Sequence, residues 1–367
     1  MNLKIGIVGL ANVGKSTLFN ALLKKQVAFA ANYPFATIEP NIGVVPVPDT
    51  RLQKLAEITK EEEHAEKLPP LVSAVVEFVD IAGLVKGASE GQGLGNKFLS
   101  HIREVDIICH VVRFFDDPSV VHVVGDVDGA RDREIVETEL ILADMQTLGK
   151  QMNPYNDQGT PKAGITKEQL VQWGIIKKLK EELNNGKLAR AVITDPEECA
   201  LIRDLHLLTM KPILYVANVS EQQLTSPITT NDSMKDIIKI CAKTESELAS
   251  LSEDDQKAYL RELGLEASGL DRLIQKAYEM LGLISFLTCG IIEARAWTIA
   301  RGTKAPLAAG TIHTDFEKKF IKADAVAFDD FVTLGGWKKA REAGKVRSEG
   351  KEYVMRDGDV VEFKIGT

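Results

Sequence analysis

Residues 9–17, GLANVGKST, have the types and the spacing of a phosphate-binding loop. Four residues separate Gly9 from Gly14, and Lys15 and Ser16 follow directly. Glycines let such a loop turn successive backbone N–H groups toward phosphate oxygens, the lysine reaches the β- and γ-phosphates, and the serine hydroxyl ligates Mg²⁺. An apolar run precedes the loop and a helical sequence follows it, which is the context in which this pattern binds nucleotides. The predicted nucleotide-binding residues of the loop are Asn12, Val13, Gly14, Lys15, Ser16 and Thr17.

Residues farther along the chain are predicted to complete the phosphate and metal site. Asp80 ends the apolar run AVVEFV and opens the sequence DIAG, so we expect its carboxylate on the Mg²⁺ side and the Gly83 backbone N–H near the γ-phosphate. Thr37 lies between these two motifs, in the loop NYPFATIEPN, and its hydroxyl is expected to close onto the metal. The predicted cofactor is therefore Mg²⁺, with Ser16, Thr37 and Asp80 as its protein ligands.

The base-reading loop departs from the guanine-specific pattern. Residues 218–221, Asn-Val-Ser-Glu, stand where Asn-Lys-x-Asp would, a motif whose aspartate accepts two hydrogen bonds from guanine. Glu221 is one methylene longer, so its carboxylate cannot take the same position without a backbone shift, and discrimination of up to about 10⁴–10⁵ is lost. Adenine can instead be read by the main chain, through a backbone N–H to its ring nitrogen and a carbonyl to its amine, and Val219 is the candidate for this contact. The residues alone leave ATP and GTP open, because Glu221 can still reach guanine in a shifted loop.

The sequence also leaves open how a water molecule is positioned for hydrolysis. Ras-like enzymes place a glutamine after DxxG, whereas Leu84 stands there in this chain and has no polar atom. One candidate is His122, because a neutral imidazole can accept a proton near neutral pH. A second is Asn12, at the position where potassium-activated relatives coordinate a monovalent cation, so K⁺ is a candidate second cofactor. A third is an arginine supplied by a partner protein, and slow intrinsic turnover is expected in every case.

These motifs require an α/β scaffold, and the chain is patterned accordingly. Short apolar runs alternate with helical or loop segments, which predicts βαβ units and a mostly parallel sheet. Two amphipathic helices interrupt this pattern, the second starting at a capping box of Thr166 and Gln169, and they predict an inserted hairpin. Short β-rich pieces after Leu283 indicate a small α+β domain. The expected domains are residues 1–125 with 195–282 for nucleotide binding, 126–194 for the hairpin, and 283–367 at the C-terminus.

The composition argues against several other classes of protein. The chain has 367 residues, 44% of them hydrophobic, enough for two or three domains with cores of their own. Its four cysteines lack CxxC spacing, which favours reduced thiols over a disulfide framework or a zinc site. No apolar run reaches the roughly 20 residues that cross a bilayer, and Met1 leads straight into a strand sequence. We expect a cytoplasmic monomer without a membrane segment, whose net charge of −8 argues against indiscriminate nucleic-acid binding.

A basic segment near the C-terminus contrasts with this acidic total. Residues 337–351, WKKAREAGKVRSEGK, carry six basic and two acidic side chains. Arg295, Trp297, Arg301 and Lys304 add a second basic and aromatic group. Basic residues interleaved with an aromatic are typical of surfaces that contact nucleic-acid backbones and exposed bases, although charge runs also occur as solvated faces.

Taken in order, the motifs resemble the Obg-related YchF family, whose eukaryotic members are the Obg-like ATPases. The resemblance rests on YPFATIEPN, DIAGLVKGASEGQGLGNKFLSHIR, NVSE, CAK and EARAWTIARGTKAPLAAGTIHTDFEKKFI, so it covers nearly the whole chain. It implies a P-loop GTPase-like domain, a coiled-coil arm formed by the hairpin, and a C-terminal β-grasp-like TGS domain. It further implies a preference for ATP over GTP, with Asn218 and Val219 lining the base. It also implies a mobile-loop histidine that matches His122, and contact with the ribosome or RNA through the TGS domain and the arm.

The sequence therefore predicts an Mg²⁺-dependent, ATP-hydrolysing P-loop switch that acts with the ribosome or RNA. Two other classes stay open at this stage. One is a GTPase translation factor, and the other is a binding module in which the nucleotide is structural and turnover is negligible.

Overall fold

The computed structural model describes residues 3–30, 41–81, 94–118, 120, 126–226 and 237–366. The chain divides into two compact units. The first comprises Met1–Gly43 and Glu77–Leu270, and the second comprises Val44–Val76 and Asp271–Thr367. Among the described residues, no helix combines the length and the apolar character that crossing a bilayer needs.

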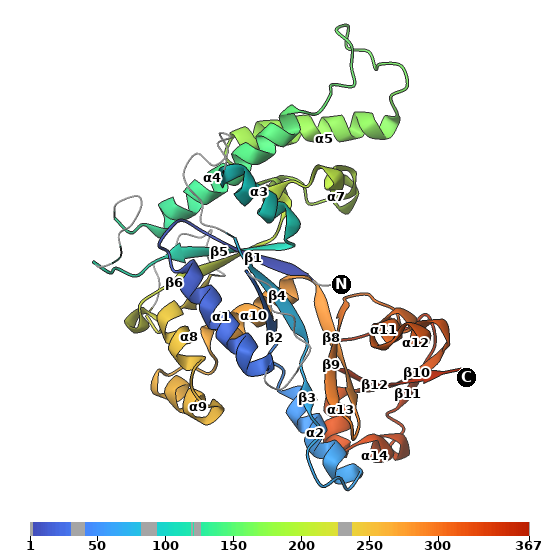
Figure 1. Cartoon of the computed structure of the whole chain (residues 1–367). Helices are drawn as coiled ribbons and strands as arrows, with labels where there is room; N and C mark the ends of the chain where they lie inside the picture. The colour runs from blue at the N-terminus through green and yellow to red at the C-terminus, as the bar shows by residue number, and fades with distance from the viewer. Residues whose placement is uncertain are drawn as a thin grey trace. The chain divides into compact units, whose positions relative to one another are not determined.

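A mostly parallel sheet forms the centre of the first unit (Figure 1). Strands β4, β1, β5, β6 and β7 pair in parallel in that order, as the alternating sequence predicts. β5 is buried along its whole length, as expected for a central strand covered on both faces. In spatial order the strands are β2 (Ile42–Pro46), β4 (Val75–Asp80), β1 (Lys4–Val8), β5 (Ile107–Arg113), β6 (Ile213–Asn218) and β7 (Ile238–Ile240).

Helices cover this sheet, and α1 directly follows the predicted phosphate loop. Because parallel strands end at the same edge, the carboxyl ends of β1, β4 and β6 lie together there. The helices of this part are α1 (Lys15–Ala30), α3 (Leu94–Glu104), α4 (Gly129–Gly149), α5 (Lys167–Asn184), α6 (Ala189–Val192), α7 (Pro196–Ile202), α8 (Ala242–Leu248), α9 (Glu253–Glu262) and α10 (Gly269–Met280), which crosses the boundary between the units.

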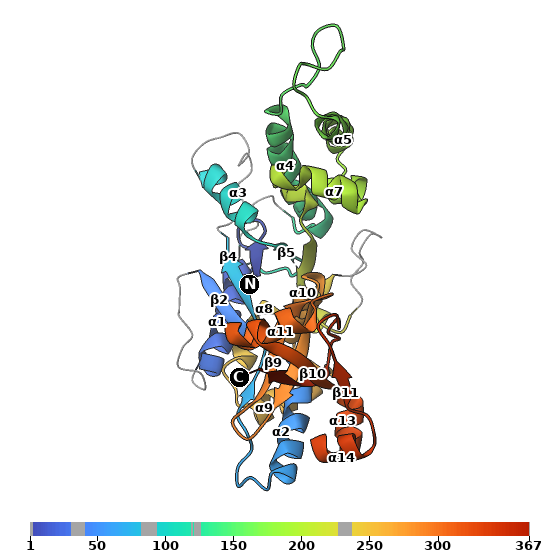
Figure 2. The same ribbon diagram turned by 90° about the vertical axis from the view of Figure 1, so that its right-hand side faces the viewer.

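The predicted helical hairpin is formed by α4 and α5, which lie side by side in both ribbon views (Figure 1, Figure 2). The capping box is present, because Thr166 accepts from the Gln169 backbone N–H and the Gln169 side chain accepts from the Thr166 N–H. Asp195 caps α7 by accepting from two backbone N–H groups. The facing apolar side chains, which include Ile141, Leu148, Ile175, Leu179 and Leu183, form a buried cluster.

The second unit is built on a mixed sheet. β10 pairs antiparallel with β11 and β12, β8 pairs antiparallel with β9, and β12 pairs in parallel with β8. Phe286 and Phe363 pack edge to face in its core. In spatial order the strands are β11 (Arg347–Glu349), β10 (Phe320–Ala327), β12 (Asp359–Ile365), β8 (Leu283–Cys289), β9 (Ala294–Ala300) and β3 (Leu71–Val72). Its helices are α2 (Arg51–Glu62), α11 (Ala305–Ile312), α12 (Thr314–Lys318), α13 (Phe328–Leu334) and α14 (Trp337–Glu342).

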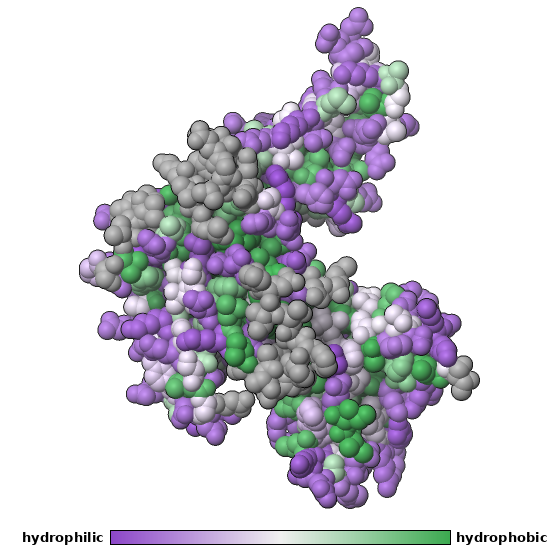
Figure 3. Space-filling view, in the orientation of Figure 1, coloured by the Kyte–Doolittle hydropathy of each residue, from purple (hydrophilic) through white to green (hydrophobic). Residues whose placement is uncertain are grey.

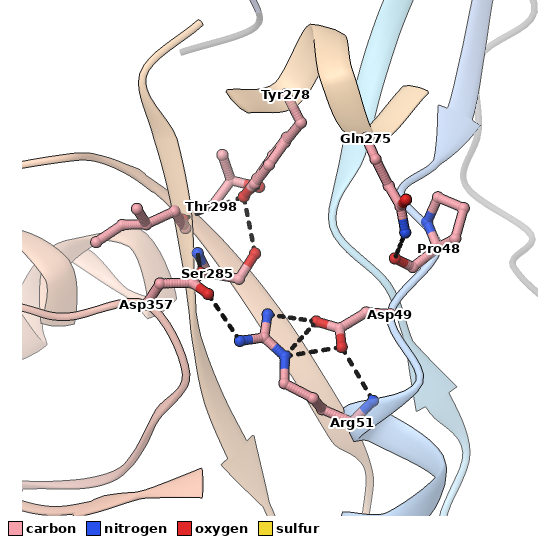
Figure 4. Close-up of polar contacts among 9 residues, drawn as sticks. Pro48, Asp49, Arg51, Gln275, Tyr278, Ser285, Thr298 and Asp357 are labelled. Carbon is pink, nitrogen blue, oxygen red and sulfur yellow. Dashed lines mark hydrogen bonds and ion pairs between the residues drawn. The ribbon is translucent and has the colours of Figure 1, made fainter. Parts of the chain in front are cut away.

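Residues 44–76 group with the C-terminal strands, whereas the sequence pattern predicts that they belong to the nucleotide-binding domain. β3 extends the C-terminal sheet by pairing in parallel with β9. Arg51 donates to Asp49 and to Asp357, which is 306 positions away, and Asp357 also accepts from the Ser285 backbone N–H at 2.8 Å (Figure 4). The partly buried carboxylate of Asp49 therefore holds a guanidinium that ties this segment to the C-terminal strands.

Candidate nucleotide-binding site

The predicted phosphate loop connects β1 to α1 and has the backbone geometry that its glycines predict. Gly9 and Gly14 have φ angles of +152° and +96°, and Asn12 adopts a left-handed conformation at +61°, which asparagine tolerates better than most residues. A Cβ atom at Gly9 would lie 2.4 Å from the carbonyl oxygen of Val111 on β5. The loop therefore runs close against β5 and turns where only glycine fits.

Lys15 places a buried cation at the start of α1. Its side chain is 8% exposed, and its Nζ donates to the Leu10 carbonyl oxygen at 2.5 Å. Burial lowers the pKa of Lys15 to about 8, and the negative charge of Asp80 opposes that shift. An ammonium group has three N–H donors, so in the described part of the chain Lys15 is short of acceptors that phosphate oxygens would supply.

Asp80 ends β4, opposite Ile7 of β1, and so borders the phosphate loop. Burial raises the pKa of this half-buried carboxyl, and the charge of Lys15 counteracts the rise. Ser16 is exposed in the first turn of α1. These positions leave a hydroxyl and a carboxylate at the mouth of the loop, while Thr37 and Gly83 lie outside the described residues.

Asn218, at the end of β6, connects the loops of the site. Its Nδ2 donates to the Val13 carbonyl oxygen at 2.9 Å, and its Oδ1 accepts from the Ala242 backbone N–H at 3.0 Å. Ala242 begins α8, directly after Cys241. The side chain is only 5% exposed, so it fixes the phosphate loop to the CAK segment from inside the fold.

The rest of the base-reading loop differs in part from expectation. The Val219 N–H donates to the Ile240 carbonyl oxygen at 2.9 Å, so in this structure it is not the donor that the main-chain reading of adenine requires. One Glu221 carboxylate oxygen accepts from the Thr244 hydroxyl at 3.3 Å and from the Tyr259 hydroxyl at 3.5 Å. Sequence reasoning missed both hydroxyls, because they lie 23 and 38 positions away and only the fold brings them to Glu221.

The candidates for water positioning are placed only in part. His122 and Leu84 lie outside the described residues. His110, on β5 opposite Val8, is the histidine that the structure places beside β1. It is 1% exposed, and burial lowers its pKa to about 3. A histidine that stays neutral and shielded from solvent cannot exchange a proton with water at a bound nucleotide.

Comparison with known protein families identifies both parts of the chain. Residues 4–151 match the family model of a "50S ribosome-binding GTPase". Residues 283–366 match the model of the C-terminal domain of YchF GTPases, which is described as a protein of unknown function.

Curated relatives and a solved structure match the chain over almost its full length. The "Ribosome-binding ATPase YchF" of Bacillus subtilis is 50% identical, with 99% of each chain covered. The protein of that name from Escherichia coli O157:H7 is 47% identical at the same coverage. The structure of the Schizosaccharomyces pombe YchF GTPase superposes with a TM-score of 0.85 at 39% identity, covering 99% of this chain and 98% of that one. The chain therefore belongs to the YchF family, P-loop NTPases that combine a G domain with a TGS-like C-terminal domain.

Proposed function

We propose that this protein is a cytoplasmic, Mg²⁺-dependent ATPase that works as a nucleotide-controlled switch together with the ribosome. The names of the bacterial relatives support this proposal. The buried, acceptor-poor ammonium of Lys15 at the head of α1 supports the binding of a triphosphate. In this proposal the residues that bind the nucleotide are Asn12, Val13, Gly14, Lys15, Ser16, Thr17, Gly83, Asn218, Val219 and Glu221.

The observation that carries the choice of ATP is the engagement of Glu221. Guanine recognition needs a carboxylate that faces the ring N–H and the exocyclic amine of the base. Here one carboxylate oxygen accepts from two hydroxyls of the protein itself, and the side chain is longer than the aspartate of the guanine-specific motif. With one of its two oxygens engaged inside the protein, Glu221 offers guanine a weaker acceptor pair, and the discrimination against adenine falls.

The residues present fit an Mg²⁺ ion held partly by the nucleotide. No cluster of three or more His, Cys, Asp or Glu side chains suited to a metal occurs among the described residues. This suits Mg²⁺, which is usually bound by one or two carboxylates together with phosphates and waters. We assign Ser16, Asp80 and Thr37 as its protein ligands. Burial raises the pKa of Asp80, and a bound cation would offset that rise by stabilising the ionised carboxylate. A bound Mg²⁺ would supply positive charge that offsets the negative charge developing on the phosphates during transfer.

The protein's own groups then have separate tasks in hydrolysis. Lys15 and the loop amides hold the phosphates, the Gly83 N–H faces the γ-phosphate, and His122 accepts or holds a proton of the attacking water. Asn12 is the position at which K⁺ would add charge. An arginine from a partner is the remaining source of activation, and it is compatible with slow turnover of the isolated chain.

Ribosome contact is assigned to the TGS-like domain and the α4–α5 arm. Much of the predicted basic segment is neutralised within the fold: Arg341 pairs with Glu362 at 2.9 Å, and Lys345 pairs with Asp330 at 3.3 Å. Lys338 and Lys339 on α14 are exposed, and neither forms an ion pair with a carboxylate of the described residues. The arm is largely hydrophilic on the face drawn in Figure 3. Both features suit a polar ribonucleoprotein surface.

Competition titration with ATP and GTP, in Mg²⁺, tests the base assignment. We expect ATP to bind at least about tenfold more tightly than GTP, a difference of about 1.4 kcal/mol. The double substitution Val219→Lys with Glu221→Asp restores the guanine-specific motif and should shift the preference toward GTP.

Tighter GTP binding by the unmodified protein would contradict the choice of ATP and favour a GTPase, as the S. pombe relative is named. An absence of Mg²⁺-dependent phosphate release would leave only a nucleotide-stabilised binding module.

Proton uptake on ATP binding follows from the pKa of Lys15. In the free protein this pKa is lowered to about 8, and the charge of a bound triphosphate must raise it. The bound state therefore holds more protons above that pH, so affinity should fall as pH rises, by up to about tenfold per unit for one proton. Calorimetry at about pH 9 in buffers of different ionisation enthalpy should show uptake of nearly one proton, and at about pH 7 almost none from Lys15.

The matched control for this measurement is Lys15→Arg. A guanidinium stays protonated throughout this range, so the variant keeps the positive charge and should lose the uptake at high pH, whatever its affinity. Uptake that persists in Lys15→Arg would assign the proton to another group.

A further inference from the structure

Arg113 is a buried cation at the end of a strand that is otherwise almost entirely apolar. It is the last residue of β5, whose sequence is IICHVVR, and it is 1% exposed. It stands opposite Asn218 of β6 in the sheet register. The end of the strand therefore places Arg113 in register with the residue that connects the phosphate loop to the CAK segment.

The guanidinium donates to main-chain carbonyl oxygens from two parts of the site. Its Nε donates to Phe115 at 3.0 Å, its Nη1 to Val120 at 3.1 Å, and its Nη2 to Asp117 at 3.4 Å. Nη1 also contacts the Asn12 carbonyl oxygen, at 3.5 Å. One side chain thus joins the phosphate loop to the segment that follows β5.

No carboxylate among the described residues forms an ion pair with Arg113. A buried charge is strongly unfavourable unless it is compensated. Here the compensation comes from the carbonyl dipoles and from the Phe115 ring, whose centroid is 4.4 Å from Cζ. The planar guanidinium of arginine can donate hydrogen bonds to several carbonyl groups in fixed directions at once. A lysine ammonium on a flexible stem cannot reproduce this arrangement.

We propose that Arg113 is a positioning residue for nucleotide hydrolysis. It fastens the carbonyl groups of Phe115, Asp117 and Val120 to the phosphate loop, so that Val120 is held at a fixed point relative to that loop. His122 stands two residues after Val120 in the sequence, and the inference rests on the proposed hydrolytic function. Arg113 itself need not touch the nucleotide, so its removal should slow turnover far more than it weakens binding.

The test compares turnover and nucleotide affinity in Arg113→Lys and Arg113→Met. Arg113→Lys keeps the charge and most of the packing, and Arg113→Met keeps the length without the charge. We expect the maximal rate of phosphate release to fall at least about tenfold in both variants, with the dissociation constant for the same nucleotide changing less than about threefold. If Arg113→Met does not fold, Arg113→Lys decides.

Arg190→Lys is the control, because Arg190 also donates to a carbonyl oxygen, of Lys211, and to the Tyr215 hydroxyl, without contacting the phosphate loop. Arg190→Lys should leave turnover unchanged, and the largest effect we expect from it is a lower melting temperature. Unchanged turnover in Arg113→Lys and Arg113→Met, or parallel losses of affinity and turnover, would overturn the positioning role. A failure of the hydrolytic proposal would appear separately, as an unmodified protein that releases no phosphate.

Discussion

Replacing Gly14 with alanine should abolish nucleotide binding under ordinary assay conditions. Gly14 has a φ angle of +96°, and a Cβ there would lie 2.1 Å from Nδ2 of Asn218. Asn218 cannot move aside freely, because that nitrogen donates to Val13 and its Oδ1 accepts from Ala242. Backbone strain of about 1–3 kcal/mol and lost hydrogen bonds of about 1 kcal/mol each imply a loss of affinity of at least about 100-fold.

Calorimetric titration with ATP and chemical denaturation measure the two parts of this effect. The free energy of unfolding should fall only by the part of this strain that the free loop retains, at most about 2–4 kcal/mol. Gly174→Ala is the matched control, because Gly174 is exposed within α5 and a Cβ there would meet no atom within 4 Å. That variant should bind ATP normally and gain about 0.5–1 kcal/mol of stability. ATP binding by Gly14→Ala at the affinity of the unmodified protein would refute the assigned loop geometry.

The parts of the fold that the sequence predicts are those with local signals. The phosphate loop, the capping box at Thr166 and the cap at Asp195 are each set by residues a few positions apart, and the structure contains all three local features. The parallel strands are apolar runs, and such runs are stable only in the buried interior of a sheet that is covered on both faces. Local chemistry therefore determines these elements before tertiary packing does.

The affiliation of residues 44–76 has no comparable local signal. β3 has only two residues, which is too short for an alternating pattern, and its partner β9 begins at Ala294, more than 200 positions later. Neither Arg51 nor Asp357 stands in a recognisable sequence motif, and they form an ion pair only because the fold brings them together. A pairing between such distant segments is set by the whole fold.

The same limit applies to the candidate site. Its phosphate-binding residues are predictable because their spacing is fixed by the loop. The hydrogen-bond partners of Glu221 and the role of Arg113 depend on which residues the fold brings together at the edge of the sheet. An arginine closing an apolar strand is the one sequence signal that could have singled out Arg113, because a charge among buried residues needs a partner. The Val219 N–H donates to the carbonyl oxygen of Ile240 on β7, and the sequence of the loop does not predict this hydrogen bond.

Replacing His122 with alanine should leave ATP binding within about threefold of normal and lower the rate of hydrolysis at least about tenfold. The chain has no glutamine after DxxG, since Leu84 stands there, so the attacking water needs another polar group. His110 cannot serve, because it is buried and its pKa is lowered to about 3. Lys15 is a cation held by a main-chain carbonyl and is suited to binding phosphate. A stopped-time phosphate-release assay at saturating ATP isolates the chemical step from binding.

His206→Asn is a suitable control, because His206 is exposed and its φ angle of +46° suits asparagine. Running both variants in K⁺ and in Na⁺ separates the two intrinsic mechanisms. If His122 positions the water, its loss slows turnover in both salts, whereas activation through a cation at Asn12 would show as a rate that depends on K⁺ and is indifferent to His122. If turnover is unchanged in His122→Ala and is also the same in K⁺ and in Na⁺, an arginine supplied by a partner is the remaining source of activation. The slow basal rate of the isolated chain would then reflect a catalytic site that is completed only in a complex.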